Sequence, residues 1–200
     1  MSAPRLILAS ASLTRRRMLE AAGLSFTAIA SDVDEENVKR AARAEGARAA
    51  ETAFLLAEMK AQKVAARNPR ALVVGADQIL VCENIWFDKP GNLQGARTQL
   101  KALRGRVHDL ETAVVCYRGG ARQWFHVSRP RLTMRGFSDA FLETYLAAER
   151  DEILGNVGAY RLEGRGAQLF EQIEGDFFSV LGLPLLPLLS YLRHARVLGG

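Results

Sequence analysis

The sequence predicts an α/β fold in which a mixed β-sheet is flanked by helices. Two observations carry this prediction. Short apolar, strand-like runs alternate with helical patterns in the first half of the chain. Later, two strand-like runs surround Gly119-Gly120 and are typical of a β-hairpin. A hairpin joins antiparallel strands, whereas strand–helix alternation favours parallel pairing, so the sheet is expected to contain both.

The first elements are expected to be a strand, a loop of small residues and a helix. Residues 6–9 form an apolar run, residues 10–12 read Ser-Ala-Ser, and residues 13–22 follow helical spacing. The first N–H groups of such a helix point into the loop without partners, so the loop is a natural seat for an anion. A second strand over 26–30 and an acidic loop over 32–36 follow.

The middle of the chain is expected to be helical and then to form strands. Residues 37–67 are rich in Ala, Arg and Glu, with a break expected at Gly46. Residues 71–74 and 78–82 are predicted as two strands, because the Gly-Ala-Asp segment 75–77 interrupts the apolar run.

In the second half, residues 93–103 are predicted as a helix, and residues 108–117 and 122–134 as the strands of the hairpin. Ser138 is a suitable N-cap for a helix that runs to about Arg150. A glycine-rich segment, a Leu/Pro-rich segment and a last helix complete the chain.

Composition narrows the class of protein. The 200 residues are 48% hydrophobic and 24% charged, which excludes disordered and fibrous classes. No repeat or linker interrupts the chain, so a single domain over residues 1–200 is expected. No uncharged apolar stretch is long enough to span a membrane, and the N-terminus lacks the pattern of a secretory signal. The two isolated cysteines, Cys82 and Cys116, favour a reducing, cytoplasmic location.

The charge balance says little about partners. The net charge is +5, from 27 Lys+Arg against 22 Asp+Glu, and only five of the basic residues are lysines. Acidic residues are interleaved with the basic ones, and no stacking aromatics accompany a basic stripe, so no specific nucleic-acid partner is expected. The charge suits an anionic ligand.

Several common catalytic sites are absent from the sequence. It has no G-x-S-x-G, Walker A or G-x-G-x-x-G motif. The three histidines lie far apart, without metal-ligand spacing, and are interpreted as structural or surface residues: His108, His126 and His194.

A few charged residues remain as candidates. Asp77 follows a glycine inside the apolar stretch 72–81, either as the cap of a turn or as a metal ligand or general base. Lys89, before Pro90, is either a solvated loop residue or a phosphate contact, and Glu35 is either solvated or a metal ligand. With the small-residue loop at 10–12, these residues fit the binding of a polyphosphate with a divalent cation and the cleavage of phosphoanhydrides.

Seven segments follow one another between Leu6 and about Leu192: LILASASLTRRRML, SDVDE, VVGADQILV, DKP, GRVHDLETAV, GAYRLEGRGAQLFEQIEGD and VLGLPL. Their order resembles that of the motifs of the Maf family of nucleoside triphosphate pyrophosphatases. The resemblance implies a cytoplasmic hydrolase that converts a nucleoside triphosphate into the monophosphate and pyrophosphate with Mg²⁺ or Mn²⁺, and that removes modified or surplus nucleotides. The family is also associated with inhibition of septum formation, so the alternative is a catalytically weak, nucleotide-binding regulator of cell division.

The resemblance also implies a fold and a set of site residues. The fold is an elongated mixed sheet flanked by helices, with two lobes around a deep nucleotide-binding cleft. Asp77 matches the family's proton acceptor and is also a candidate metal ligand, and Glu35 matches an acidic position suited to the metal. The positions that match phosphate-binding residues are Ser12, Arg15, Lys60 and Lys89. The expected partners are the nucleotide and a second copy of the chain in a homodimer, without a membrane.

Three positions bear on the base of the nucleotide. Gln78 and Glu163 resemble the branch that acts on 7-methyl-GTP rather than the branch that acts on dTTP and UTP. Thr14 stands where the first branch usually has Trp and the second Arg, and the third motif reads GADQ rather than GSDQ. The carboxylate of Glu163 is suited to accept hydrogen bonds from a guanine edge or to pair with a cationic methylated base.

Overall fold

The computed structural model describes residues 5–199, and within this range the strands form one mixed sheet of eight strands. The order along the sheet is β2-β1-β3-β5-β7-β8, with β4 paired to β3 and β6 paired to β5. Strand β1 runs parallel to β2 and β3, whereas β4, β6, β7 and β8 pair antiparallel. The strands are β1 (Leu6–Leu8), β2 (Thr27–Ala28), β3 (Leu72–Cys82), β4 (Ile85–Phe87), β5 (Val107–Arg118), β6 (Ala121–Ser128), β7 (Arg131–Met134) and β8 (Phe170–Glu174). The predicted mixed α/β sheet is confirmed.

Seven α-helices and three short 3₁₀ segments lie within the described residues. The helices are α1 (Leu13–Ala21), α2 (Glu35–Ala44), α3 (Ala49–Ala66), α4 (Leu93–Leu103), α5 (Asp139–Glu149), α6 (Phe177–Val180) and α7 (Leu185–His194). The 3₁₀ segments are η1 (Arg150–Ile153), η2 (Val157–Ala159) and η3 (Arg165–Leu169). Across residues 5–199, every helix is too short or too polar to cross a membrane.

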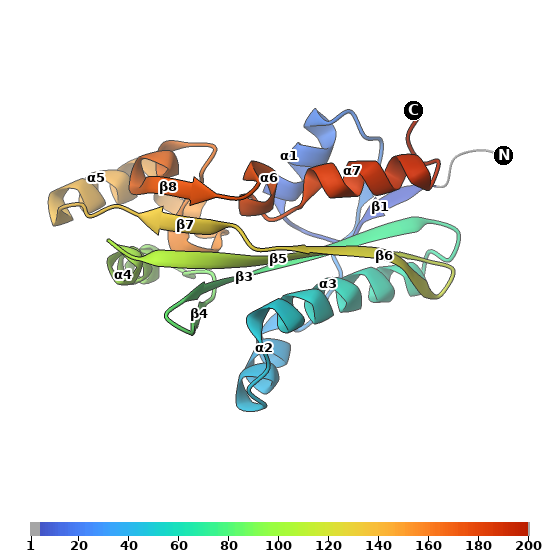
Figure 1. Ribbon diagram of the computed structural model, residues 1–200, viewed down its shortest axis with the longest axis horizontal. Coiled ribbons are helices and arrows are strands. Elements are labelled where there is room, and N and C mark those ends of the chain that lie inside the picture. The colour runs from blue at the N-terminus through green and yellow to red at the C-terminus, as the bar shows by residue number, and fades with distance from the viewer. Residues whose placement is uncertain (1–4, 200) are drawn as a thin grey trace. The chain divides into compact units, whose positions relative to one another are not determined.

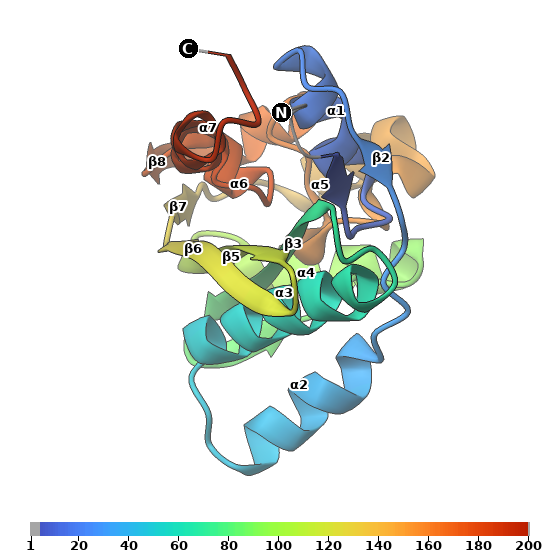
Figure 2. The same cartoon turned by 90° about the vertical axis from the view of Figure 1, so that its right-hand side faces the viewer.

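The chain divides into two compact units, and β3 and β5 contribute residues to both. The first unit runs up to Gln78, includes Thr112–Ser128 and resumes at Phe177. In this unit α1 and α7 lie on one face of the strands, and α3 with α2 on the other (Figures 1 and 2). One core cluster fills the face under α1 and α7; it includes Leu6, Leu8, Met18, Leu19, Leu72, Val74, Val114, Cys116, Leu185, Leu188 and Leu192.

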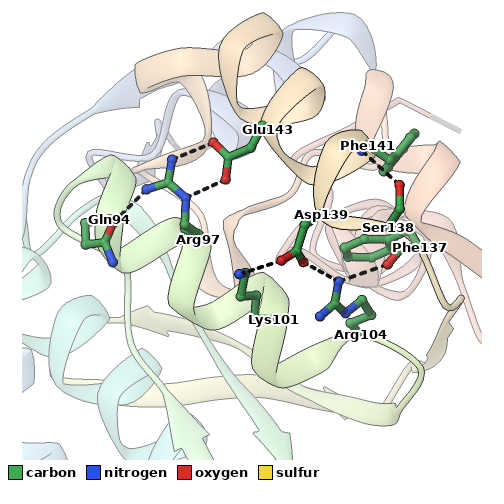
Figure 3. A network of polar contacts seen from close by, with 9 residues as sticks. All are labelled: Gln94, Arg97, Lys101, Arg104, Phe137, Ser138, Asp139, Phe141 and Glu143. Carbon is green, nitrogen blue, oxygen red and sulfur yellow. Dashed lines mark hydrogen bonds and ion pairs between the residues drawn. The ribbon is translucent and has the colours of Figure 1, made fainter.

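The second unit comprises Ile79–Glu111 and Arg129–Asp176 and contains α4 and α5. Figure 3 shows the polar contacts that join these two helices. Arg97 donates to both carboxylate oxygens of Glu143, and Asp139 accepts from Lys101 and Arg104. Ser138 caps α5 by accepting a hydrogen bond from the N–H of Phe141 at 3.2 Å, as the sequence predicts.

One prediction about the strands is wrong. Residues 75–77 do not interrupt the sheet, because β3 continues from Leu72 to Cys82. Gly75 is required for close packing instead: a Cβ there would lie 2.2 Å from the carbonyl oxygen of Ala57 in α3. A glycine in a sequence can indicate either a turn or a close approach of two backbones. Here it indicates the close approach of helix and strand.

The predicted strand over 122–134 is also wrong in extent. It is two strands, β6 and β7, which are separated at Arg129-Pro130. Proline has no N–H to donate to a strand ladder, so the chain leaves one pairing here and begins another. The predicted hairpin turn at Gly119-Gly120 is confirmed, with φ of 58° and 79°.

Candidate active site

Strand β3 presents two polar side chains on opposite faces of the first unit. Successive side chains of a strand alternate between faces, so Gly75 and Asp77 share one face and Gln78 lies on the other. The Gly75 face packs directly on α3, since a Cβ on Gly75 would also lie 2.7 Å from the backbone nitrogen of Ala61. The carboxylate of Asp77 is therefore directed toward α3, and the amide of Gln78 toward the C-terminal segment.

A buried lysine joins two carboxylates at this face. Lys60 of α3 places Nζ 2.6 Å from Oδ1 of Asp77 and 2.7 Å from Oε1 of Glu35, the first residue of α2. Lys60 and Asp77 are both buried. A buried carboxylate is costly without a partner, and the ammonium supplies the compensating charge. The second carboxylate oxygen, Oδ2 of Asp77, is buried and has no hydrogen-bond partner among residues 5–199.

A second lysine shapes the loop that presents Glu35. Lys63, one turn after Lys60 on α3, donates from Nζ to the carbonyl oxygen of Asp32 at 2.5 Å. Asp32 has a φ of 50°, and Asp34 caps α2 by accepting from the N–H of Asn37 at 3.0 Å. The acidic loop is thus held against α3 and delivers Glu35 to Lys60.

The loop before α1 is organised by two serine hydroxyls. Ser10 Oγ accepts from the N–H of Ser12 at 3.2 Å, and Ser12 Oγ accepts from the N–H of Arg15 at 3.3 Å. The second bond is the N-cap of α1, and it leaves the hydroxyl hydrogen of Ser12 as a donor. Thr14 is half-buried in the first turn of the same helix.

Arg15 ties α1 to β3 and to the turn before α7. Its Nε donates to the carbonyl oxygen of Gly182 at 2.7 Å, and its Nη1 donates to the carbonyl oxygen of Ala76 at 2.8 Å. Burial lowers the pKa of the Arg15 guanidinium, and the negative charges of Asp77 and Glu35 partly offset this shift. Arg15 therefore contributes positive charge to the carboxylates from a rigid position.

Gln78 holds the segment around α6. Its Nε2 donates to Thr112 Oγ1 at 2.8 Å and to the carbonyl oxygen of Ser179 at 2.9 Å. The fully buried Thr112 hydroxyl also donates to the Ser179 carbonyl, at 3.1 Å. A Cβ at Gly182, whose φ is 95°, would lie 3.7 Å from Oε1 of Gln78. The amide nitrogen of Gln78 is thus engaged in hydrogen bonds within the protein.

A cation at this site would have two carboxylates as protein ligands. No cluster of three or more Asp, Glu, His or Cys side chains suited to a metal occurs among the described residues. Asp77 and Glu35 face one positive centre, Lys60 Nζ, and Asp77 Oδ2 is an acceptor without a donor. Mg²⁺ is commonly held by one or two carboxylates plus phosphate oxygens and water, so the donor set fits a cation that arrives with a phosphate ligand.

The model of a protein family described as Maf-like protein matches residues 5–195. The chain belongs to the Maf family. The family resemblance expected from the motifs is therefore confirmed, and it covers both units of the structure.

Relatives are similar over almost their whole length. A protein of Granulibacter bethesdensis named nucleoside triphosphate pyrophosphatase is 56% identical over 97% of this chain and 98% of its own. One of Paramagnetospirillum magneticum with the same name is 54% identical over 94% and 97%. One of Rhizobium meliloti named 7-methyl-GTP pyrophosphatase is 47% identical over 96% of each chain.

The structure brings most of the predicted Maf site residues into one unit. Lys60, Asp77 and Glu35 are in direct contact, and Ser12 and Arg15 share the capped turn of α1. The roles assigned to these residues remain predictions. In the structure, Lys60 contacts carboxylates and Arg15 contacts backbone carbonyls.

Two predicted residues belong to the second unit. Lys89 is exposed in the loop between β4 and α4, where the carbonyl oxygen of Asp88 accepts from Gln99 Nε2 at 2.7 Å. Glu163 lies before η3, with Oε1 3.7 Å from Nε of Arg161. Arg161 also pairs with Glu152 at 2.5 Å, so the carboxylate of Glu163 shares its counter-ion.

Three residues of the arrangement were not predicted: Lys63, Thr112 and Gly182. Lys63 follows Lys60 at helical spacing, and Thr112 is a threonine in a buried strand. Gly182 is a glycine within a Leu-rich segment. These are weak signals, because each residue acquires its role from a partner distant in the chain.

Proposed function

We propose that this protein is a nucleoside triphosphate pyrophosphatase, a hydrolase that cleaves between the α and β phosphates and releases the monophosphate and pyrophosphate. The observation that carries the proposal is the buried Asp77 with its unpartnered Oδ2, beside Lys60 and Glu35. The printed names of the relatives support it. Asp77 is a carboxylate with an open lone pair next to a positively charged group, as a proton acceptor in phosphoryl chemistry requires.

In the proposed reaction Asp77 orients water and takes one of its protons. The water oxygen forms a bond to the α-phosphorus, and the bond from this phosphorus to the bridging oxygen breaks. Pyrophosphate leaves with that oxygen. In the first unit, the negative charge of the phosphates is stabilised by the Ser12 hydroxyl, the N-terminus of α1 and Arg15. We assign a further compensating charge to Lys89.

A divalent cation, Mg²⁺ or Mn²⁺, is part of the proposal. Asp77 and Glu35 are the residues that would hold it, and it would neutralise charge on the phosphate oxygens as pyrophosphate leaves. Both carboxylates are hydrogen-bond acceptors for Lys60 in this structure, so they are already oriented toward one positive centre.

Pyrophosphate release from a nucleotide panel tests the activity. The panel contains 7-methyl-GTP, GTP, dTTP and UTP, each with Mg²⁺, Mn²⁺ or a chelator. We expect release that needs a divalent cation. Nucleotide binding without release would contradict the proposal and support the alternative, a binding regulator of cell division.

For the base we propose 7-methyl-GTP ahead of dTTP and UTP. Support comes from Gln78 and Glu163, which match that branch, and from the name of the Rhizobium meliloti relative. The Glu163 carboxylate would attract the positive charge of a methylated guanine and accept from its N–H groups. The removal of modified or surplus nucleotides is the physiological role that we infer from this preference.

Replacing Glu163 tests the base preference. We expect Glu163→Gln to lower kcat/KM for 7-methyl-GTP relative to GTP by roughly tenfold, because an amide retains hydrogen bonding but loses the charge. The measurement is pyrophosphate release by wild type and variant on both nucleotides. Glu152→Gln, which removes another carboxylate partner of Arg161, is the matched control. An unchanged ratio in Glu163→Gln would exclude a role of this charge in base choice.

A further inference from the structure

Lys60 occupies the position between two carboxylates where a divalent cation would bind. We propose that Lys60 is an exchangeable counter-ion: its ammonium neutralises Asp77 and Glu35 in the nucleotide-free protein and releases them when cation and triphosphate enter together. The inference rests on the proposed function, because it concerns how that same site is loaded. It gives Lys60 two successive contacts, first the carboxylates and then the phosphate.

The geometry makes the ammonium and a shared cation mutually exclusive. Nζ lies 2.6 Å from Asp77 Oδ1 and 2.7 Å from Glu35 Oε1. A Mg²⁺ ion bound by the same two oxygens would need distances of about 2.0–2.1 Å to each. The ammonium and the ion would then lie so close together that their charges repel strongly, so these two oxygens can share a cation only after Nζ has moved.

Lys60 is better able to change partners than the neighbouring Arg15. The Nε and Nη1 atoms of Arg15 are committed to the carbonyl oxygens of Gly182 and Ala76. Lysine carries a compact charge on a flexible four-carbon stem, and its three donors are not confined to one plane. The site is open to solvent on the side of Glu35, whose side chain is 38% exposed, against 6% for Lys60 and 4% for Asp77.

Charge balance explains why exchange would accompany nucleotide binding. Arg15 and Lys60 place two positive charges beside the two carboxylates. A cation alone would have to displace the ammonium and leave it without a partner in a buried place, which is costly. A triphosphate supplies new oxygen partners for that ammonium, so cation affinity should be low until the nucleotide is present.

A cation bound at the other oxygen of Asp77 would affect the measured affinity differently. Asp77 Oδ2 is buried and without a partner, and it could accept a cation while Lys60 stays on Oδ1. In that case the lysine does not compete, and removing it changes the affinity only through the general loss of one positive charge. A neutral substitution of another basic residue on α3, away from the acidic loop, measures that general effect.

The experiment measures Mn²⁺ binding by nucleotide-free protein, with the free ion quantified by electron paramagnetic resonance. Lys60→Met should lower the Kd for Mn²⁺ at least about tenfold relative to wild type. The control is Arg67→Met at the C-terminal end of the same helix, which removes an equal charge from an exposed residue that has no contact with the loop that presents Glu35 in the described structure. Its Kd should stay within about twofold of wild type. Lys60→Gln, which keeps a donor for Asp77, provides the same comparison if Lys60→Met does not fold.

Adding Asp77→Asn to Lys60→Met should abolish the gain, because the shared oxygen pair is lost. Equal Kd values for wild type and both Lys60 variants would overturn the proposal, and so would an equal gain in Arg67→Met. Pyrophosphate release is measured in parallel on wild type. Absence of release would contradict the proposed function, whereas equal Mn²⁺ affinities would contradict the counter-ion role alone.

Discussion

The carboxylate of Asp77 is costly to bury, and it is also the proposed proton acceptor of the site. It is 3% exposed within a strand whose neighbours are apolar, and its charge is tolerated because Lys60 and Arg15 lie close to it. The same arrangement leaves Oδ2 without a donor. An acceptor that the protein itself leaves unsatisfied is suited to a proton or a cation.

Asp77→Asn tests what this carboxylate contributes to activity and to stability. We expect pyrophosphate release to fall at least about 100-fold, because an amide cannot take a proton from water. The free energy of unfolding should fall by about 1–3 kcal/mol, since the buried ammonium of Lys60 keeps only Glu35. Urea titration and a pyrophosphate assay measure these quantities.

The double variant Asp77→Asn with Lys60→Met is the control for stability. Removing both charges should recover part of the lost free energy of unfolding without recovering activity. A fully active Asp77→Asn protein would remove Asp77 from the proposed mechanism.

At the scale of elements, the site depends on how closely α3 approaches β3. Gly75 and the small residues Ala57 and Ala61 allow backbone contact between helix and strand. Lys60 lies between those alanines on the helix, and Asp77 lies two residues after Gly75 on the strand, so the close approach also brings the ion pair together. The same three small residues therefore determine both packing and the position of charge.

Gly75→Ala tests this contact. A Cβ placed 2.2 Å from the Ala57 carbonyl oxygen forces helix and strand apart, and we expect the free energy of unfolding to fall by about 3 kcal/mol. Gly136→Ala is the matched control, because a Cβ there meets nothing within 4 Å. Chemical denaturation of both variants gives the comparison. Equal stabilities would show that the strand can shift without cost.

At the scale of the whole molecule, a buried histidine links folding to pH. His108, in the second unit, is 1% exposed, and its Nε2 shares a hydrogen bond of 2.9 Å with the Tyr160 hydroxyl. Burial lowers its pKa from 6.5 to about 4, against an opposing contribution from Asp109. The folded chain therefore holds the ring neutral at pH values where the unfolded chain protonates it.

Stability should be lost as the pH falls from about 6.5 toward 4. In this window the unfolded state binds the proton first, and the loss should reach about 2 kcal/mol near pH 5. His108→Gln removes the titrating group and keeps a polar partner for Tyr160. Urea unfolding at about pH 7.5 and about pH 5 should show a smaller difference for this variant than for wild type. Identical differences would assign the pH dependence to other groups.

Much of the local structure could be predicted from the sequence. The N-cap at Ser138 and the hairpin at Gly119-Gly120 follow from residue types that favour these conformations locally. The motif order also sufficed to place the chain in its family. The strand break expected at 75–77 failed because the same glycine signal marks either a turn or a close contact.

The sequence by itself determined most of the elements, the family and the candidate residues, because each depends on local preference or motif order. Only the tertiary structure decided which charges meet. Lys60 and Asp77 are 17 residues apart and come together because α3 packs on β3. Arg15 reaches Gly182 across 167 residues, and Gln78 reaches Ser179 across 101. Partners at such separations are set by the packing of helices on a sheet, which no local pattern encodes.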